Sequence, residues 1–439
     1  MVTLQPDAEA VARRLCDAGH RVYIVGGAVR DALMGRESHD ADLATTARPE
    51  QVLAAIPTGV ADGAAFGRIL VGAVDVVTLR RDGIYRDARR PSSVEYTNSI
   101  EEDLARRDFT VNAMAVEYGS DCVIDPFGGQ RDLAAGVLRC VGDPAQRFRE
   151  DALRMMRAVR FVGTLGLSLD QPTAAAVGEY AQAIRLVSPE RVRDELSRLL
   201  VGQHAAAGLR AMRDTGLLAA ALPELAPMAG CPQRNPHHHH DDVFKHTIAV
   251  VEAIAPTLPL RLAALLHDCG KPATRVRHAD GVDTFYGHEE EGSEVAAMLL
   301  NRLAFPKALA ERVVRNVRHH MFRFGPEAKD AAVRRFIARV GIEAIPDLLD
   351  LRAADVEGSG EADFGDSSAR LRRVMAAGEA GQAAFGLRDL AVRGNDVVSL
   401  GFRGREIGTA LQQCLDAVLE NPTRNTREAL LEFLATSRA

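Results

Sequence analysis

Two aspartates near the start of the chain stand at alternate positions, in the segment Asp40-Ala-Asp42. If this segment is a β-strand, both carboxylates leave the same face of the strand. Such a pair can hold two Mg²⁺ ions, which nucleotidyl transfer uses to activate an attacking 3′-hydroxyl and to neutralise a triphosphate. We expect Asp75, on a neighbouring strand, to supply a third carboxylate. The pattern predicts Asp40, Asp42 and Asp75 as catalytic residues, with a solvated turn as the alternative for an isolated pair.

A glycine-rich turn precedes the aspartate pair. The apolar run Val22–Val25 predicts a short strand, and Gly26, Gly27 and Arg30 follow it where a helix is expected to begin. The missing side chains let the backbone approach phosphate oxygens, while a helix N-terminus and the Arg30 guanidinium attract anions. A tight turn without a ligand is the alternative. Together with the aspartates, the turn predicts a nucleotide-binding site at Gly26, Gly27 and Arg30.

The elements that must position these residues form an α/β region in the first third of the chain. Short β-branched runs, such as 22–25 and 69–77, alternate there with glycine-rich turns and helix-like stretches. Beyond about residue 142 the strand signals fade, and apolar residues recur at helical spacing. We therefore predict an α/β head, a small mixed sheet flanked by helices, followed by an all-α neck, a third helical domain and a helical tail. The expected boundaries are 1–140, 141–225, 226–360 and 361–439.

Composition limits the class of protein. The 439 residues are 47% hydrophobic, which excludes a mainly disordered chain. A net charge of −6 gives no overall sign of nucleic-acid binding, but arginines cluster at 80–107 and 139–160 and could contact phosphates locally. No stretch is apolar enough to span a bilayer, and the six cysteines lack CxxC spacing. We expect a soluble cytoplasmic protein with reduced thiols and no membrane partner.

Longer motifs connect the first two sites to a known family. The segments Gly26–Asp31 and Asp40–Thr45 resemble the signature of class II tRNA nucleotidyltransferases, the CCA-adding enzymes. The segments Glu101–Met114 and Asp125–Gly129 are similar to that family in order and spacing. The resemblance implies an enzyme that adds CCA to the tRNA 3′ end from CTP and ATP, without a template and with Mg²⁺ at the aspartates. We infer no obligate protein partner.

The same resemblance assigns roles to a polar group later in the head. Arg107, Asp108 and Asn112 match the motif that holds the triphosphate and distinguishes ribose from deoxyribose. Their chemistry suits that task, because the arginine can pair with phosphate while the other two offer an acceptor and a donor to sugar hydroxyls. The competing explanation is a structural salt bridge of Arg106 or Arg107 with Glu102 or Asp103.

The segment Glu150–Phe161 resembles the family's nucleotide-selecting helix. In a helix, Asp151, Arg154 and Arg157 would lie along one stripe, and Arg160 would continue it. We expect Asp151 to accept and Arg154 to donate hydrogen bonds to the Watson–Crick edge of cytosine or adenine, so that side chains replace a template. All four residues belong to the predicted nucleotide site. An exposed, salt-bridged helix is the alternative.

The segment 80–95 resembles the family's flexible loop, which is associated with the switch from CTP to ATP. Asp82 stands where the family commonly has a glutamate. The presence of the loop disfavours addition of CC alone, whereas an enzyme that adds only the terminal A stays open. Near the C-terminus, the segments Gly401–Leu411 and Asn425–Glu428 resemble the family's tail, which contacts the tRNA elbow by shape and phosphate charge.

Histidines and aspartates in the third quarter of the chain have the order of the HD phosphohydrolase superfamily, and the segment His267–Pro272 resembles its core. Imidazoles and carboxylates suit a divalent metal that activates water against a phosphate ester. Some members of the tRNA nucleotidyltransferase family carry this HD domain and hydrolyse 2′,3′-cyclic phosphates, 2′-nucleotides or phosphatase substrates. The resemblance therefore implies a second activity. His288, and His319 with His320, could complete a second metal position. The predicted metal ligands are His246, His267, Asp268, Asp355, His288 and His319.

Three other functions remain open from the sequence. A poly(A) polymerase would share the catalytic motifs. An HD phosphohydrolase whose head only binds RNA, or an RNA-binding factor without catalysis, would not need them. The presence of Asp40, Asp42 and Arg107 disfavours these last two alternatives.

Overall fold

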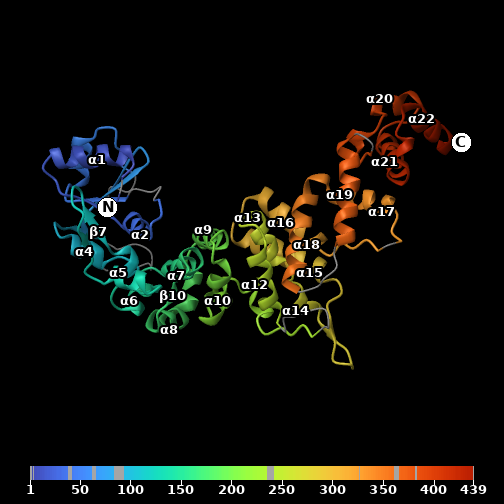
Figure 1. The fold of residues 1–439 in the computed structure, drawn as a ribbon. Coiled ribbons are helices and arrows are strands. Elements are labelled where there is room, and N and C mark those ends of the chain that lie inside the picture. Colours follow the sequence, from blue (N-terminus) through green and yellow to red (C-terminus); the bar gives the residue numbers. More distant parts are fainter. Residues whose placement is uncertain are drawn as a thin grey trace. The chain divides into compact units, whose positions relative to one another are not determined.

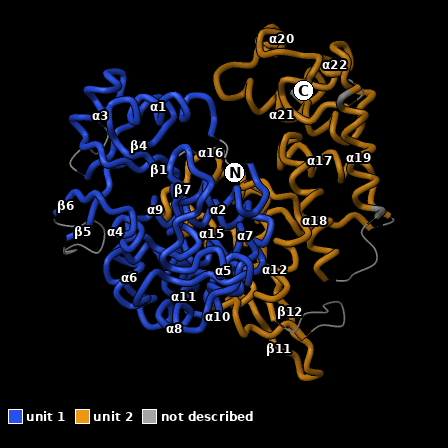
Figure 2. The backbone as a smooth tube through the Cα atoms, turned by 60° about the vertical axis from the view of Figure 1, so that its left-hand side comes forward, with its two compact units in different colours: residues 1–226 blue, residues 227–439 orange. Residues whose placement is uncertain are grey.

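The computed structural model describes residues 2, 4–37, 42–61, 66–83, 93–234, 242–325, 327–359, 365–380 and 383–438. The chain divides into two compact units, residues 1–226 and 227–439, drawn in blue and orange in Figure 2. The predicted Asp40, most of the predicted flexible loop and the histidines at 237–240 lie outside the described residues. No helix of the described part is long and apolar enough to cross a membrane.

The first unit, whose N-terminal part is drawn in blue in Figure 1, contains a six-stranded sheet in the order β3-β4-β2-β1-β7-β8. Strands β2 and β4 are parallel and every other neighbouring pair is antiparallel, so the sheet is mixed. The run 69–77 forms two strands rather than one, because Gly72 turns the chain at a φ of +61°. The strands are β1 (Val22–Val25), β2 (Asp42–Thr45), β3 (Arg68–Val71), β4 (Val74–Thr78), β7 (Ala115–Glu117) and β8 (Val123–Ile124).

Alternation along the strands separates the two faces of the sheet. Ile24 and Leu43 share a buried apolar cluster with residues of α1 (Pro6–Asp17) and α3 (Pro49–Ala55). Their neighbours Val25 and Ala44 belong to a different cluster, with residues of α4 (Ile100–Ala105). Because side chains alternate, Asp42 lies on the same face as Ala44. The side chain of Asp42 thus points away from the face of the sheet that α1 covers.

The smaller elements of the first unit are α2 (Gly27–Leu33), β5 (Arg80–Asp82), β6 (Val94–Tyr96), α5 (Gly129–Ala134), β9 (Val137–Leu138) and β10 (Ser168–Leu169).

The rest of the first unit is helical. Helix α7 (Leu153–Leu165) packs between α9 (Pro189–Leu200) and α10 (Ala205–Asp214). The approach to α10 is close, because a Cβ on Gly208 would lie 2.8 Å from the Val159 carbonyl oxygen. The single helix expected over residues 150–162 is wrong at its start, since the chain is extended at Asp151 and a separate helix ends before it. The remaining helices are α6 (Pro144–Glu150), α8 (Gln171–Tyr180) and α11 (Leu217–Ala221).

The second unit is almost entirely helical. Its first part packs α12, α13, α15, α16 and α18 against one another. Buried residues from 322 to 434 form one apolar cluster, so residues on both sides of the expected boundary at 361 share a core. The α/β head followed by helical parts confirms the predicted fold class. The elements are α12 (Val243–Ala253), α13 (Leu258–Leu266), α14 (Lys271–Thr274), β11 (Val276–Arg277), β12 (Asp283–Thr284), α15 (His288–Arg302), α16 (Lys307–His319), α17 (Asp330–Val340), α18 (Ile345–Ser359), α19 (Gly365–Glu379), α20 (Gly394–Ser399), α21 (Arg405–Glu420) and α22 (Arg427–Arg438).

Candidate functional sites

The parallel pairing of β2 and β4 brings two predicted catalytic residues side by side. Asp42 and Asp75 are Cα partners in the register of these strands, so their side chains leave the same face. Asp42 is half-buried. Asp75 accepts hydrogen bonds from Arg68 Nε at 2.8 Å with both carboxylate oxygens. A metal ion at Asp75 would therefore compete with Arg68 for that carboxylate.

The glycine turn lies against Arg107. Gly26 has a φ of +69°, and a Cβ at this position would lie 2.9 Å from Arg107 Nη1 and 3.8 Å from Asp42 Oδ2. At a contact under 3.0 Å something must shift, and here the atom that would shift is the end of the Arg107 side chain. Glycine therefore lets the guanidinium stay where it is. Arg107 Nη1 donates to the Asn112 carbonyl oxygen at 3.3 Å, and Nη2 is 3.3 Å from an oxygen of Asp103. The structural salt bridge considered from the sequence is therefore present, and it orients the guanidinium beside Asp42.

A chain of buried polar contacts runs from the glycine turn to α7. Arg30 Nη1 donates to Asn112 Oδ1 at 2.6 Å, and Asn112 Nδ2 donates to Asp108 Oδ1 at 3.1 Å. The second oxygen of Asp108 lies 2.6 Å from Arg157 Nη2. Burial alone would raise the pKa of Asp108, but Arg157 and the Asn112 amide hold it at about 2. Three segments distant in sequence are thereby joined, and Asp108 stays ionised.

One aromatic ring collects three of the predicted arginines. The guanidinium carbons of Arg160, Arg30 and Arg157 lie 3.9, 5.3 and 5.5 Å from the centroid of the Phe161 ring. Arg160 Nε is also 2.5 Å from a carboxylate oxygen of Glu195. Burial lowers the pKa of Arg160 to about 10, although Glu195 opposes that shift. Phe161 and Glu195 were not predicted as site residues, and the cation–π and ion-pair contacts reveal them only in the tertiary structure.

The two residues expected to read the base are engaged with protein groups. Asp151 accepts from the Leu153 amide at 3.1 Å and from Arg191 Nη2 at 3.0 Å. Arg154 is buried and donates to a Glu150 oxygen at 2.7 Å and to the Arg106 carbonyl oxygen at 3.0 Å. Because Asp151 precedes α7, it does not share a helical stripe with Arg154. Base recognition by this pair requires these internal bonds to be exchanged for bonds to the nucleotide.

Residues 80–83, the described start of the predicted flexible loop, include an aspartate whose buried side chain pairs with two arginines. Asp82 Oδ1 accepts from Arg80 Nε at 2.9 Å, and its other oxygen lies 3.8 Å from Arg106 Nη1. The substitution of aspartate for the family's usual glutamate therefore still gives a paired carboxylate at this position.

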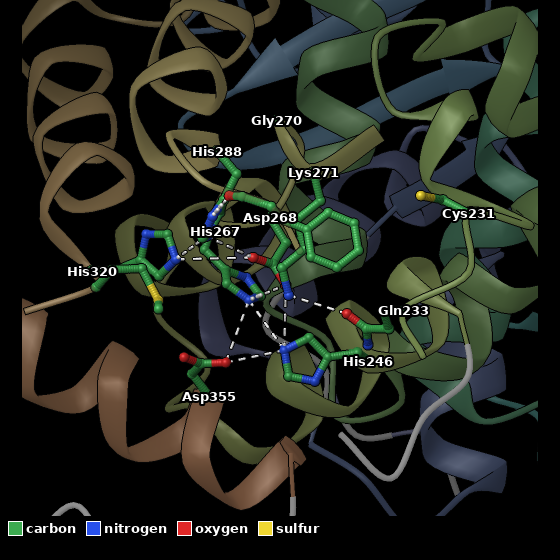
Figure 3. A network of polar contacts seen from close by, with 12 residues as sticks. Cys231, Gln233, His246, His267, Asp268, Gly270, Lys271, His288, His320 and Asp355 are labelled. Carbon is green, nitrogen blue, oxygen red and sulfur yellow. Dashed lines mark hydrogen bonds and ion pairs between the residues drawn. The ribbon is translucent and has the colours of Figure 1, made fainter. Parts of the chain in front are cut away.

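The second unit holds a separate cluster of buried histidines and aspartates (Figure 3). Its first group comes from α12, the end of α13 and α18: His246 Nε2 lies 3.0 Å from Asp355 Oδ1 and 3.3 Å from His267 Nε2. Asp268 Oδ2 approaches His267 Nε2 at 3.1 Å. The ligand atoms of His246, His267 and Asp355 all lie close enough to one another to hold a single metal ion.

Asp268 extends the cluster to a second group. Its Oδ1 atom lies 3.4 Å from His288 Nε2 and 3.9 Å from His320 Nε2, and these two nitrogens are 3.3 Å apart. The three side chains also satisfy the geometry of a metal-holding group. Asp268 thus stands between two candidate metal positions, with one oxygen towards each.

Backbone hydrogen bonds orient three of these histidines. In His267, His288 and His320, the Nδ1 atom donates to the carbonyl oxygen three residues earlier, at 2.7–2.8 Å. This bond leaves Nε2 as the atom with a lone pair, and the Nε2 atoms face the centre of the cluster. The neutral Nε2 atoms of His288 and His320, 3.3 Å apart, cannot hydrogen-bond each other, whereas both can ligate a cation. The donor set therefore fits divalent metals.

Two basic residues complete the surroundings of this centre. Lys271 Nζ lies 2.7 Å from Asp268 Oδ2, and Arg352 Nη1 lies 2.5 Å from Asp355 Oδ2. Burial alone would raise the pKa of Asp268, but His267 and Lys271 keep it well below its ordinary value. A cavity of about 450 Å³ opens onto the two acids and both basic residues. An anionic phosphate could enter there and meet cationic groups beside the metal positions.

Comparisons with known proteins also separate an N-terminal head from a later HD domain. Residues 22–139 match the Poly A polymerase head domain, residues 166–228 match the probable RNA and SrmB-binding site of polymerase A, and residues 243–357 match the HD domain. An A-adding tRNA nucleotidyltransferase of Deinococcus radiodurans is 39% identical over 367 residues, which cover 80% of this chain and 78% of the relative. The chain belongs to the tRNA nucleotidyltransferase family.

Other members of the tRNA nucleotidyltransferase family are similar to about half of the chain in sequence, or to nearly all of it in structure. A CCA-adding enzyme of Geobacillus stearothermophilus is 46% identical over 225 residues, which are 50% of this chain and 55% of that enzyme. The aligned part thus spans about half the length of that relative. A crystal structure of the Bacillus stearothermophilus CCA-adding enzyme in complex with CTP is 29% identical, with a TM-score of 0.75, over 99% of this chain and 98% of that one. A Thermotoga maritima CCA-adding enzyme complexed with tRNA, 19% identical with a TM-score of 0.57, shares the fold.

One of the metal ligands predicted from the sequence needs correction. Of the two adjacent histidines at the end of α16, His320 lies in the buried cluster. The ring of His319 instead packs edge-on against Phe336, with 6.3 Å between centroids. Adjacent residues on a helix leave it about 100° apart, so only one of the two can face the cluster. No sequence motif singled out Arg352, because its position depends on the packing of α18.

Proposed function

We propose that this protein adds CCA to the 3′ end of tRNA from CTP and ATP, without a nucleic-acid template, in the cytoplasm. The observation that carries the proposal is the convergence of Asp42, the Gly26 turn and Arg107 on one face of the head sheet. Membership of the tRNA nucleotidyltransferase family supports it. The similar Bacillus stearothermophilus enzyme forms a complex with CTP, which supports CTP as one substrate.

The proposed division of labour follows the contacts in the head. Asp40 and Asp42, with Asp75 as a third carboxylate, would hold Mg²⁺, which when bound supplies charge neutralisation at the triphosphate and activation of the 3′-hydroxyl. Gly26, Gly27, Arg30 and Arg107 would hold the triphosphate, because the open backbone and two guanidiniums offer donors to its oxygens. The tRNA 3′-hydroxyl would attack the α-phosphorus in line, and pyrophosphate would leave.

The sugar and base would be recognised by the polar chain between head and neck. Asp108 and Asn112 would bind the ribose hydroxyls, with Arg157 keeping Asp108 ionised. Asp151 and Arg154 would read the Watson–Crick edge after releasing Arg191 and Glu150, respectively. Arg160 belongs to the same proposed site through its stacking on Phe161.

The domain boundaries at 141, 226 and 361 remain part of the proposal.

The decisive experiment is an extension assay with Mg²⁺ and three tRNA primers, which end before CCA, after C and after CC. Each primer is incubated with CTP, ATP or both, and the products are resolved on a gel. Stepwise addition of C, C and A, lost in the double variant Asp40→Ala/Asp42→Ala, is the expected result. Asp121→Asn, an exposed aspartate in the turn between β7 and β8, is the matched control and should retain activity.

Addition of A alone is the second candidate, because a relative that matches along 80% of the chain is an A-adding tRNA nucleotidyltransferase. The same assay separates the two candidates. Incorporation of A on the CC-ended primer only, with no C incorporation on the shorter primers, would establish A addition and contradict the first proposal. No extension of any primer would contradict both. Long A tracts in the presence of CTP would indicate a poly(A) polymerase.

We also propose a phosphohydrolase activity at the HD cluster. His246, His267 and Asp355 would hold one divalent metal, and Asp268, His288 and His320 a second. When bound, such metals supply Lewis acidity towards a phosphate ester and lower the pKa of water. Hydrolysis of a 2′,3′-cyclic nucleotide should be lost in His246→Ala and kept in His278→Ala, whose histidine is exposed outside the cluster. Equal activity of both variants would contradict this second function.

A further inference from the structure

A second cavity in the HD part of the chain has no role in the sites described above. It has a volume of about 620 Å³ and lies among the start of α15, the end of α16, the segment after α16 and α17. That volume lies within the range of about 300–1,000 Å³ typical of ligand pockets. Four arginines line it: Arg318, Arg323, Arg335 and Arg339.

The charge in this arginine cavity is only partly balanced. Two glutamates also line it, and one of them, Glu290, lies 3.6 Å from Arg318 Nη2. Arg335 pairs with Glu420. Arg339 instead stacks on Phe336, with 5.6 Å between its guanidinium carbon and the ring centroid. Arg323 is exposed and has no ion-pair partner among the residues that the structure describes. The cavity thus offers at least two guanidiniums to an anion.

The lining of the cavity combines guanidiniums with aromatic side chains. Guanidiniums bind phosphate oxygens through paired N–H donors and stay charged at all accessible pH values. Phe322, Phe324 and Phe336 also line the cavity, and of these three rings Phe324 is the one that is partly exposed. A ligand with both phosphates and flat apolar groups, such as a nucleic-acid strand, matches this combination.

The arginine cavity adjoins the metal centre. Glu289 and Met321 line both the 620 Å³ cavity and the 450 Å³ cavity that opens onto Asp268 and Asp355. Met321 is 47% exposed, and its sulfur lies 3.6 Å from Arg352 Nη1, which in turn contacts Asp355. The two cavities are therefore neighbours, because they share Glu289 and Met321 as lining residues.

We propose that the arginine cavity binds the internucleotide phosphates of a single-stranded RNA end whose terminal phosphate lies at the HD metal centre. A mononucleotide held at the metals would not need the arginines, because Lys271 and Arg352 already flank that centre. A longer strand needs a cationic path for its next phosphates, and the cavity provides one. The inference rests on the phosphohydrolase proposed for the HD cluster and names its substrate class.

The kinetic test compares two substrates that end in the same 2′,3′-cyclic phosphate, a mononucleotide and a hexaribonucleotide, with the full chain. The variant Arg323→Ala/Arg339→Ala removes the two guanidiniums of the cavity that have no acidic partner among the described residues. The control Arg277→Ala/Arg302→Ala removes the same charge from exposed positions of β11 and α15. We expect the first variant to raise the KM of the hexamer roughly tenfold or more, with the mononucleotide changed less than about twofold. An equal change for both substrates, or no change, would overturn the proposal.

A binding measurement separates failure of this proposal from failure of the hydrolase. Amide hydrogen exchange of the full chain is followed with and without a hexaribonucleotide that carries a 3′-phosphate. Slower exchange in segments 318–324 and 332–339 of the wild type, but not of the Arg323→Ala/Arg339→Ala variant, supports the arginine cavity even if neither substrate is hydrolysed. Unchanged exchange in these segments overturns it, whatever the activity of the metal centre.

Discussion

Replacing Gly26 by alanine should test how the glycine turn positions Arg107. The new Cβ would lie 2.9 Å from Arg107 Nη1, closer than real Cβ contacts, and the backbone would keep a φ of +69° that favours glycine. Two costs follow. Backbone strain costs about 1–3 kcal/mol of stability. Displacement of the guanidinium from the proposed triphosphate site costs a charged hydrogen bond of about 1.5–3 kcal/mol, or roughly 10- to 150-fold in kcat/KM.

The assay measures kcat/KM for nucleotide addition at a temperature where urea unfolding shows the variant to be folded. Gly72→Ala is the matched control, because Gly72 has a φ of +61° but no atom within 4 Å of its added Cβ. We expect both variants to lose stability and only Gly26→Ala to lose most of its activity. If the two variants keep equal activity when folded, the reasoning that Gly26 leaves room for Arg107 is refuted.

Three further outcomes are expected. Asp108→Asn should destabilise the first unit by roughly 2 kcal/mol above pH 4, because the pKa of Asp108 in the folded protein is lowered to about 2. The difference in unfolding free energy between wild type and variant, measured by urea unfolding, should shrink as pH falls from 4 towards 2. His320→Ala should lower the divalent metal bound to the purified protein, measured by elemental analysis, whereas His319→Ala should retain it. Gly208→Ala should lower the melting temperature, because its Cβ would meet a backbone oxygen at 2.8 Å; an unchanged melting temperature would mean that α7 and α10 can separate freely.

The head was predictable because its signals are local. A four-residue apolar strand, two glycines and a helix N-terminus follow one another within Val22–Leu33, so their arrangement needs little tertiary information. The run 69–77 was harder, because a continuous β-branched run hides the hairpin turn at Gly72. The residues of that run still form strands, and Asp75 lies beside Asp42 as expected.

The neck shows where periodicity fails. Apolar spacing predicted a helix through Asp151, but its carboxylate accepts hydrogen bonds from the Leu153 amide and from Arg191, forty positions later. A side chain that caps the next helix and pairs with a distant arginine favours an extended backbone that spacing cannot reveal. Arg154, assigned to the base, likewise bonds to carbonyl oxygens of segments that only packing brings close.

The amino-acid sequence by itself determined the chemistry: which carboxylates, glycines, arginines and histidines are present, in an order that indicates nucleotidyl transfer and an HD metal centre. Those features are local or depend on order alone. The tertiary structure decided which groups meet. It joined Asp108 to Arg157, brought three arginines onto Phe161, and selected His320 over His319. The physical reason is that helix rotation, strand register and long-range ion pairs arise from packing between segments, which no single stretch of sequence contains.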